Sequence, residues 1–211
     1  MIQYLGFGDS WAFGDELNKP QEQPYINLIS DTALNYARPG TSIPQLVIQL
    51  RKFIAEDYQP NTKYRAVFFL TAQERFFTYY NGTDYAFNPR GVFHLTSNVN
   101  DLNTQYYKYF YSDEFANYTA NTTILTLQSI CRHYNIEDYY LPGWQTFEWW
   151  PEVNQTRIYP ETCQTILEAE IDTFGQVADN PYFTNPGCHP NYLGHQKIAQ
   201  TLSKFLTISE I

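Results

Sequence analysis

Short apolar segments and segments with helical spacing alternate along this chain. The strand candidates are Ile2–Phe7, which ends at a glycine, Ala66–Leu70, which is continuously apolar, and Tyr139–Leu141. Continuous apolar runs of this length are typical of parallel strands that are buried on both faces. Asn35–Ala37 is a further short strand candidate, and it leads into a Pro-Gly turn.

The segments between these strand candidates have apolar residues at helical spacing. The expected helices lie at 25–34, 43–54, 124–131 and 193–205, with a more polar helix at about 162–174. Ser42 precedes the second of these helices and is a suitable N-cap. Strands that alternate with helices imply a parallel sheet with helices on both faces, so we expect one α/β domain over residues 1–211.

The periodic pattern is lost between about residue 76 and residue 118, where aromatic residues, Asn, Asp and Gly predominate. A stretch of this length is too long for an ordinary connection in a compact domain. We interpret it as an insertion that forms a lid or a substrate wall. An irregular surface meander, packed by its own aromatic side chains, is an equally good interpretation.

Size and charge limit the classes of function. At 211 residues the chain is long enough for one well-packed domain and short for two. The formal net charge is −9 without a basic cluster, which argues against nucleic acid and against an anionic membrane surface as partners. No apolar run is long enough for a membrane span, and the oligomeric state is left open. Aromatic residues make up 18% of the chain, a content that suits both cores and carbohydrate-binding surfaces.

The N-terminal segment and the cysteines bear on the compartment. Ile2–Phe7 is too short for the core of a signal peptide and lacks a basic lead. Cys131, Cys163 and Cys188 have no metal-ligand spacing, and their odd number argues against a complete disulfide framework. We therefore expect a protein that is cytoplasmic, or released without a classical signal peptide. No metal or organic cofactor is implied.

Two motifs at opposite ends of the chain contain the candidate chemistry. Gly8-Asp9-Ser10 follows the first strand, and His189-Pro190-Asn191 precedes the last helix. Ligands of open α/β sheets bind at the carboxyl ends of the strands, which is where this serine is expected. A serine hydroxyl needs a base to become a nucleophile, and histidine is the usual base near neutral pH. We therefore predict that Ser10 is a nucleophile and that His189 is its base.

Simpler interpretations exist for some of these residues. Asp9 and Ser10 are both good N-cap residues, so this pair could merely begin a helix. Asn191 is expected to hold the local turn through bonds from its side chain to the backbone. His195 lies inside the final helix and is expected to be structural.

These two motifs, in this order and at this separation, resemble the first and last motif blocks of the SGNH (GDSL-type) hydrolases. The resemblance spans nearly the whole chain. It implies a three-layer α/β/α sandwich with a mostly parallel, flavodoxin-like central sheet, and cleavage of esters, often acetyl or acyl groups on sugars or lipids. It assigns the nucleophile to Ser10 and the base to His189. Gly40, in the turn after the second strand, matches the block whose glycine amide points into the oxyanion hole.

Two positions depart from the pattern of that family. Its third block is Gly-x-Asn-Asp, whose asparagine donates to the oxyanion, and Gln73 stands there with the same amide on a longer side chain. The family usually has an aspartate three residues before the histidine, where this chain has Pro186. The backbone carbonyl of Pro186 is our candidate for orienting His189. Arg75 is a further candidate to face the pocket, with a structural ion pair as its alternative.

We therefore expect a serine esterase that hydrolyses acyl esters, including O-acetyl esters of carbohydrates, through a Ser10–His189 dyad or an incomplete triad. The oxyanion would be held by the backbone amides of Ser10 and Gly40 and by the side chain of Gln73. The partner would be a small-molecule or carbohydrate ester. The alternative is a catalytically weakened module of the same fold that binds glycans or has a structural role. A third interpretation is an unrelated flavodoxin-like domain in which the motifs occur by chance.

Overall fold

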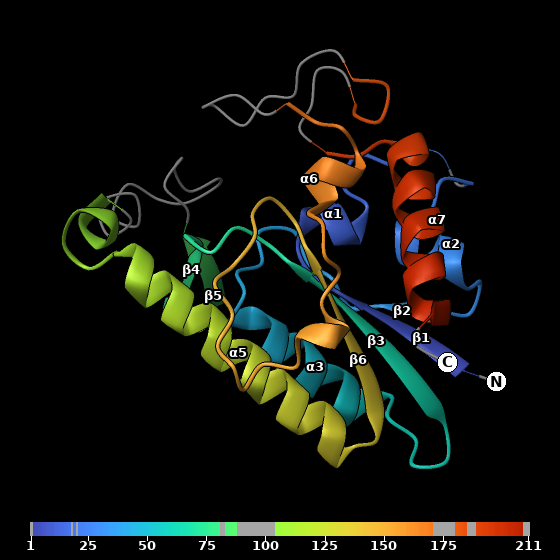
Figure 1. Ribbon diagram of the computed structural model, residues 1–211, viewed down its shortest axis with the longest axis horizontal. Coiled ribbons are helices and arrows are strands. Elements are labelled where there is room, and N and C mark those ends of the chain that lie inside the picture. Colours follow the sequence, from blue (N-terminus) through green and yellow to red (C-terminus); the bar gives the residue numbers. More distant parts are fainter. Residues whose placement is uncertain are drawn as a thin grey trace.

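A parallel sheet in the strand order β2-β1-β3-β6 forms the centre of the protein (Figure 1). In this computed structural model the strands are β1 (Ile2–Phe7), β2 (Leu34–Asn35), β3 (Lys63–Leu70) and β6 (Ile136–Pro142). The structure describes residues 2–17, 19, 21–80, 83–87, 104–170, 180–184 and 189–208, with the backbone alone for 76–80, 83–87 and 208.

The register brings the carboxyl ends of the strands to one edge of the sheet. β1 pairs with β3 with Phe7 opposite Phe68, and β3 pairs with β6 with Leu70 opposite Pro142, both in parallel. Seven of the eight residues of β3 are buried, including the whole of the apolar run Ala66–Leu70, as expected for a central parallel strand. The residues that follow β1, β2 and β3 therefore lie along one edge, where an open α/β sheet binds its ligands.

Helices cover both faces of the sheet and complete the expected three-layer α/β/α architecture (Figure 1). On one face, α3 (Gln45–Glu56) and α5 (Asp113–His133) pack over a core that includes Phe68 and Tyr140. The other face is covered by α1 (Ser10–Phe13), α2 (Tyr25–Ile29), α6 (Cys163–Ile166) and α7 (Tyr192–Ile208).

The strand predictions at 2–7, 66–70 and 139–141 are confirmed by β1, β3 and β6, and the helix prediction at 193–205 by α7. The helix expected at 25–34 ends at Ile29, because a turn in which Ala33 N donates to Ser30 O directs Leu34 into β2. The helix expected at 43–54 is α3, which begins at Gln45 after the N-cap Pro44, so the prediction of Ser42 as N-cap is wrong. Ser42 N and Oγ instead donate to Oε1 of Gln45.

Two further helices differ from the predictions in length. α5 begins at Asp113 rather than near residue 124, so the last six residues of the segment 76–118 are helical. Its N-cap Ser112 accepts from Phe115 N, and acidic Asp113 and Glu114 follow in the first turn, where they favour a helix start. α6 ends at Ile166 rather than near residue 174, and Glu168 then adopts a left-handed conformation with φ 53°.

The remainder of the segment 76–118 contains regular structure. β4 (Phe76–Tyr80) and β5 (Thr83–Phe87) form an antiparallel hairpin, and residues 104–109 are helical. Residues 88–103 lie outside the described part. The role of the segment as a lid or substrate wall stays a prediction.

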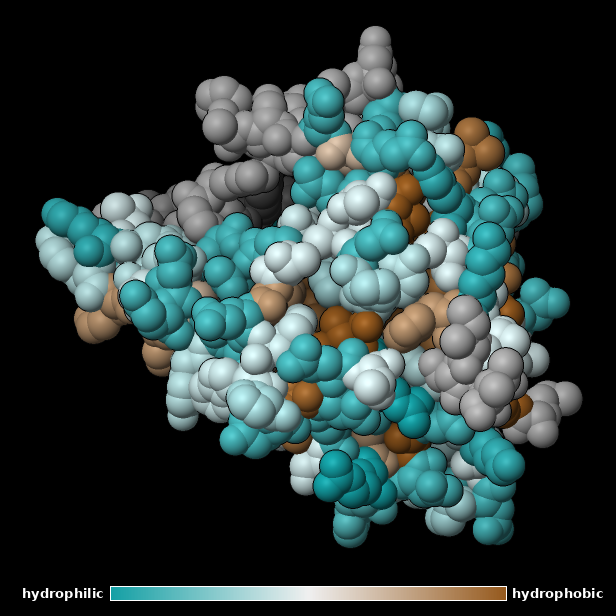
Figure 2. All heavy atoms as spheres, in the orientation of Figure 1, coloured by the Kyte–Doolittle hydropathy of each residue, from teal (hydrophilic) through white to brown (hydrophobic). Residues whose placement is uncertain are grey.

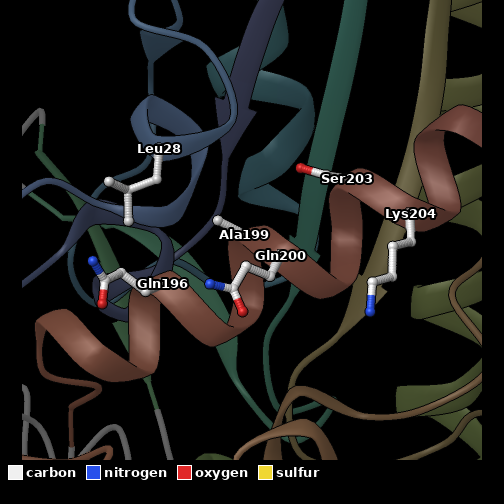
Figure 3. Close-up of a pocket in the computed structure, with 6 residues that line it drawn as sticks. All are labelled: Leu28, Gln196, Ala199, Gln200, Ser203 and Lys204. Carbon is white, nitrogen blue, oxygen red and sulfur yellow. The ribbon is translucent and has the colours of Figure 1, made fainter.

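The surface in Figure 2 is mainly hydrophilic, with apolar side chains in small patches. Within the described part of the chain, no helix combines the length and the apolar character needed to cross a membrane. A cavity of about 530 Å³ lies between α2 and α7 and is lined by Leu28, Gln196, Ala199, Gln200, Ser203 and Lys204 (Figure 3). None of the predicted site residues lines this cavity.

Candidate active site

Ser10 is the first residue of the short helix α1, directly after β1. Gly8 lies between them with φ +154°, and a Cβ there would come within 2.6 Å of Ala12 Cβ, so the turn requires a glycine. Asp9 is the N-cap, and its Oδ1 accepts from Trp11 N at 2.9 Å. The capping interpretation therefore holds for Asp9, while Ser10 remains available for chemistry with 8% of its surface exposed.

The carboxylate of Asp9 is completely buried and connects three loops. Its Oδ2 accepts from Thr71 Oγ1 at 2.7 Å and from Arg75 Nη1 at 2.9 Å. Arg75 also reaches Thr41 O at 3.4 Å. Arg75 thus makes a structural ion pair, which was the alternative to a position facing the pocket. This ion pair fixes the loops after β1, β2 and β3 relative to one another.

Gln49 of α3 is a second connector, and sequence reasoning did not identify it. Its Oε1 accepts from Gly8 N at 2.9 Å, while its Nε2 donates to Gly8 O at 2.8 Å and to Thr41 Oγ1 at 2.9 Å. An amide on the apolar face of the helix, beside Leu46 and Phe53, was the available signal, because a buried polar group needs partners.

The predicted oxyanion donors follow three adjacent strands. Ser10 follows β1, Gly40 lies in the turn after β2 with φ +76°, and Gln73 is partly buried after β3. Arg38 N donates to Gly8 O and ties the second loop to the first. Among the residues that the structure describes, the amides of Ser10 and Gly40 donate to no protein acceptor. Both amides are therefore available to an oxygen atom of a ligand.

His189 lies on the loop before α7, and its mostly buried ring faces two carboxylates of the turn that follows α1. Nδ1 lies 3.1 Å from Glu16 Oε1, and Nε2 lies 4.0 Å from Asp15 Oδ2. The backbone of His189 is held as well, because its carbonyl accepts from Thr184 N at 3.1 Å. The contacts of the described residues include no hydrogen bond between the Ser10 hydroxyl and this ring. The loop of His189 thus lies against the N-terminal segment, and the ring contacts the carboxylates of Asp15 and Glu16 there rather than the hydroxyl of Ser10.

The loop around His189 is fixed as the sequence predicts. Asn191 Nδ2 donates to Pro181 O and Phe183 O, and its Oδ1 accepts from Gly194 N. The ring of Phe183 lies 5.3 Å from that of Trp11, which joins this loop to α1. Pro186, our candidate for orienting the histidine, lies outside the described residues.

Sequence reasoning missed Asp15 and Glu16. Both follow α1 in a stretch that gives no periodic signal, and only the meeting of the chain ends brings them to His189. The signal available in the sequence was the presence of two carboxylates shortly after a candidate nucleophile.

His195 has the expected structural role. It is completely buried in α7, and its Nδ1 accepts from Tyr25 N at 3.2 Å. Burial, and after it the electrostatic interaction with the nearby His189 ring, lowers the pKa of His195 from 6.5 to about 4. The ring is therefore neutral in the folded protein near neutral pH.

The two cysteines that the structure describes, Cys131 and Cys163, contribute no reactive group to this site. Cys131 and Cys163 are free and buried, and burial raises the pKa of both thiols. Cys188 lies outside the described residues. Within the described ranges, no group of three or more His, Cys, Asp and Glu side chains could hold a metal ion.

No protein-family model and no curated protein matches the sequence. Solved structures do match. A G-D-S-L-family protein described as lipolytic, from Desulfitobacterium hafniense, has a TM-score of 0.53 and 14% identity over 96% of this chain and 98% of its own. A lipolytic protein of the same family from Veillonella parvula has a TM-score of 0.52 and 15% identity over 98% of this chain and 99% of its own.

A third similar structure is an acetyl xylan esterase from the rumen bacterium Butyrivibrio proteoclasticus, with a TM-score of 0.52 and 9% identity. The alignment covers 99% of this chain and 64% of that one. The sheet order, the helical layers and these structures agree with the fold that the two terminal motifs predict. The chain therefore has the three-layer α/β/α fold of the GDSL-type (SGNH) hydrolases.

Proposed function

We propose that this protein is a serine ester hydrolase of the SGNH type, with Ser10 as nucleophile and His189 as base. The observation that supports it most is the position of Ser10. It begins a helix at the carboxyl edge of the sheet, on a turn fixed by the buried Asp9, while its own amide and that of Gly40 have no acceptor in the described part of the protein. Such amides can hold the oxyanion of an acyl transfer.

In the first half of the reaction, Nε2 of His189 takes the proton of Ser10 Oγ while Oγ bonds to the acyl carbon of the ester. The carbonyl oxygen becomes an oxyanion, which accepts from the amides of Ser10 and Gly40 and from the side chain of Gln73. The bond between the acyl carbon and the alcohol oxygen then breaks, and that oxygen takes the proton from Nε2.

In the second half, water gives a proton to Nε2 as its oxygen bonds to the acyl carbon. Ser10 Oγ leaves with that proton, and the acid is released. Nε2 must reach Ser10 Oγ for both halves. Catalytic hydrogen bonds of substrate-free enzymes are often long and shorten when the substrate binds, so the contact with Asp15 is compatible with this step.

The proposed substrates are acyl esters, including O-acetyl esters of carbohydrates. The support is the similarity of fold to two lipolytic proteins and to an acetyl xylan esterase.

The test is hydrolysis of 4-nitrophenyl acetate and of acetylated xylo-oligosaccharides by wild type, Ser10→Ala and His189→Ala. We expect both variants to lose at least about 10³-fold in kcat. Ser203→Ala, at a half-buried position of α7 that lines the separate cavity beside α2, is the matched control and should retain wild-type rates. Equal inertness of wild type and Ser10→Ala on a broad ester panel would overturn the proposal in favour of a binding module.

Gln73 is tested separately because its side chain is longer than the asparagine of the family pattern. If its amide donates to the oxyanion, Gln73→Ala should lower kcat about 10²-fold with little change in KM. A kcat that stays within about twofold of wild type would remove Gln73 from the site.

A further inference from the structure

The geometry points to Glu16 as the residue that positions the imidazole of His189, in place of the aspartate that this chain lacks three residues before it. Glu16 Oε1 lies 3.1 Å from Nδ1, which is the ring nitrogen on the far side from the one that must act as base. Position 186 has a proline, whose side chain cannot accept a hydrogen bond. This role of Glu16 in catalysis rests on the proposed function.

The backbone of Glu16 is in an unfavourable conformation that brings its side chain to the ring. Its φ is 69°, in the left-handed region that costs a residue with a side chain about 1 kcal/mol. Residues held in this region persist only where their surroundings determine them, and they concentrate at functional sites. The turn is anchored to the nucleophile itself, because Gly14 N and Asp15 N both donate to Ser10 O, at 3.1 and 3.0 Å.

The carboxylate of Glu16 contacts both the ring of His189 and the segment that holds its backbone. Its Oε2 accepts from the hydroxyl of Thr184, whose backbone N–H donates to His189 O at 3.1 Å. Glu16 thus has one oxygen for each part of the histidine loop. A surface carboxylate in chance contact with a histidine would need neither the hydrogen bond from Thr184 nor the left-handed backbone of Glu16.

A carboxylate at Nδ1 has a defined chemical effect. It accepts from Nδ1–H, which selects the tautomer with an unprotonated Nε2, and it stabilises the imidazolium that forms when Nε2 takes a proton. Among the described residues, Asp15 is a second charged group that faces this ring, 4.0 Å from Nε2, while the nearby His195 is buried and neutral. Of the two carboxylates, only Glu16 is on the side that leaves the base free.

The kinetic test compares Glu16→Gln with Glu168→Gln. Glu168 is a matched control, because it also has a left-handed backbone, with φ 53°, and pairs with Lys197 at 2.6 Å. We expect Glu16→Gln to lower kcat about 10²- to 10⁴-fold with KM within about threefold. Glu168→Gln should keep wild-type kcat. Glu16→Asp restores the charge and should recover part of the lost kcat, and thermal melts of all variants should show that they fold.

A second readout does not depend on activity. The ¹⁵N chemical shifts of the His189 ring report its tautomer, which we expect to be Nδ1–H in wild type and in Glu168→Gln, and to shift towards Nε2–H in Glu16→Gln. An Nε2–H tautomer in wild type, or an unchanged tautomer in Glu16→Gln, would overturn the inference. If Ser10→Ala and wild type are equally inert while the tautomer shifts as expected, the proposed function fails and the positioning by Glu16 stands. If Ser10→Ala is inactive but Glu16→Gln keeps wild-type kcat, the positioning role fails and the hydrolase stands.

Discussion

Replacing His195 by asparagine is expected to remove part of the pH dependence of folding stability. His195 is completely buried, and its Nδ1 accepts a hydrogen bond from Tyr25 N. Protonation of Nδ1 would turn it into a donor that faces the donor Tyr25 N–H, and it would bring a positive charge into the core. Asparagine places an acceptor oxygen near the position of Nδ1 but does not titrate in this range.

The magnitude follows from the pKa of His195, which falls from 6.5 in the unfolded chain to about 4 in the folded protein. Since the folded pKa is depressed, this contribution to stability is fully present above pH 6.5 and is lost as the pH falls towards 4. The loss is about 2 kcal/mol at pH 5 and about 3 kcal/mol below pH 4, because only the unfolded chain binds the proton within this window. For a chain of this size, 2 kcal/mol corresponds to a change in Tm of about 4–8 °C.

The assay is urea unfolding of wild type and His195→Asn at pH 7.5 and at pH 5. Other titrating groups are common to both proteins, so the difference between them isolates His195. Wild type should lose about 2 kcal/mol more than the variant between the two pH values. His133→Asn, on the exposed end of α5, is the control and should behave as wild type. Equal losses in wild type and His195→Asn would show that titration of His195 does not contribute to the pH dependence of stability.

The buried turn and the ion pair of the site give two further predictions, both measured by urea unfolding. Gly8→Ala should lower the free energy of unfolding by about 3 kcal/mol, because the added Cβ would lie 2.6 Å from the nearest side-chain atom. Gly40→Ala, with φ +76° and open space around the added Cβ, should lower it by about 1 kcal/mol. Similar losses at both positions would contradict this prediction. Arg75→Met should lower the free energy of unfolding by about 3 kcal/mol, because it removes the counter-charge of the buried Asp9. The control Arg51→Met, on the exposed face of α3, should stay within about 0.5 kcal/mol of wild type. An equally small effect of Arg75→Met would show that the ion pair is not needed for stability.

The strand β3 could be predicted from the sequence because most of it is buried on both faces. Its segment Ala66–Leu70 is a continuous apolar run for that reason, and a run of this kind is a strong signal. The start of α5 could not be found in the same way. Its first turns contain Asn121, whose burial depends on bonds to Glu148 O and Trp150 N, contributed by a loop that follows much later in the chain. Partners from a distant part of the chain cannot be inferred from the helical spacing of apolar residues.

The candidate site likewise contains residues that could be predicted from the sequence and residues that could not. The positions of Ser10 and Gly40 could be predicted because each closely follows a strand, and short motifs with glycine mark the ends of strands. Glu16 could not be predicted, since its contact with His189 requires a left-handed backbone at a residue that is not glycine. The sequence pointed to the backbone carbonyl of Pro186 for orienting the histidine, and only the fold identifies a carboxylate within reach of the ring.

Reaction with a fluorophosphonate, followed by peptide mass spectrometry, shows whether Ser10 is a nucleophile that His189 activates. We expect one adduct per chain on the peptide that contains Ser10, absent in Ser10→Ala and formed at least about 10²-fold more slowly in His189→Ala. Wild-type protein without an adduct on Ser10, or an adduct that forms equally fast in His189→Ala, would contradict the proposed roles of the two residues.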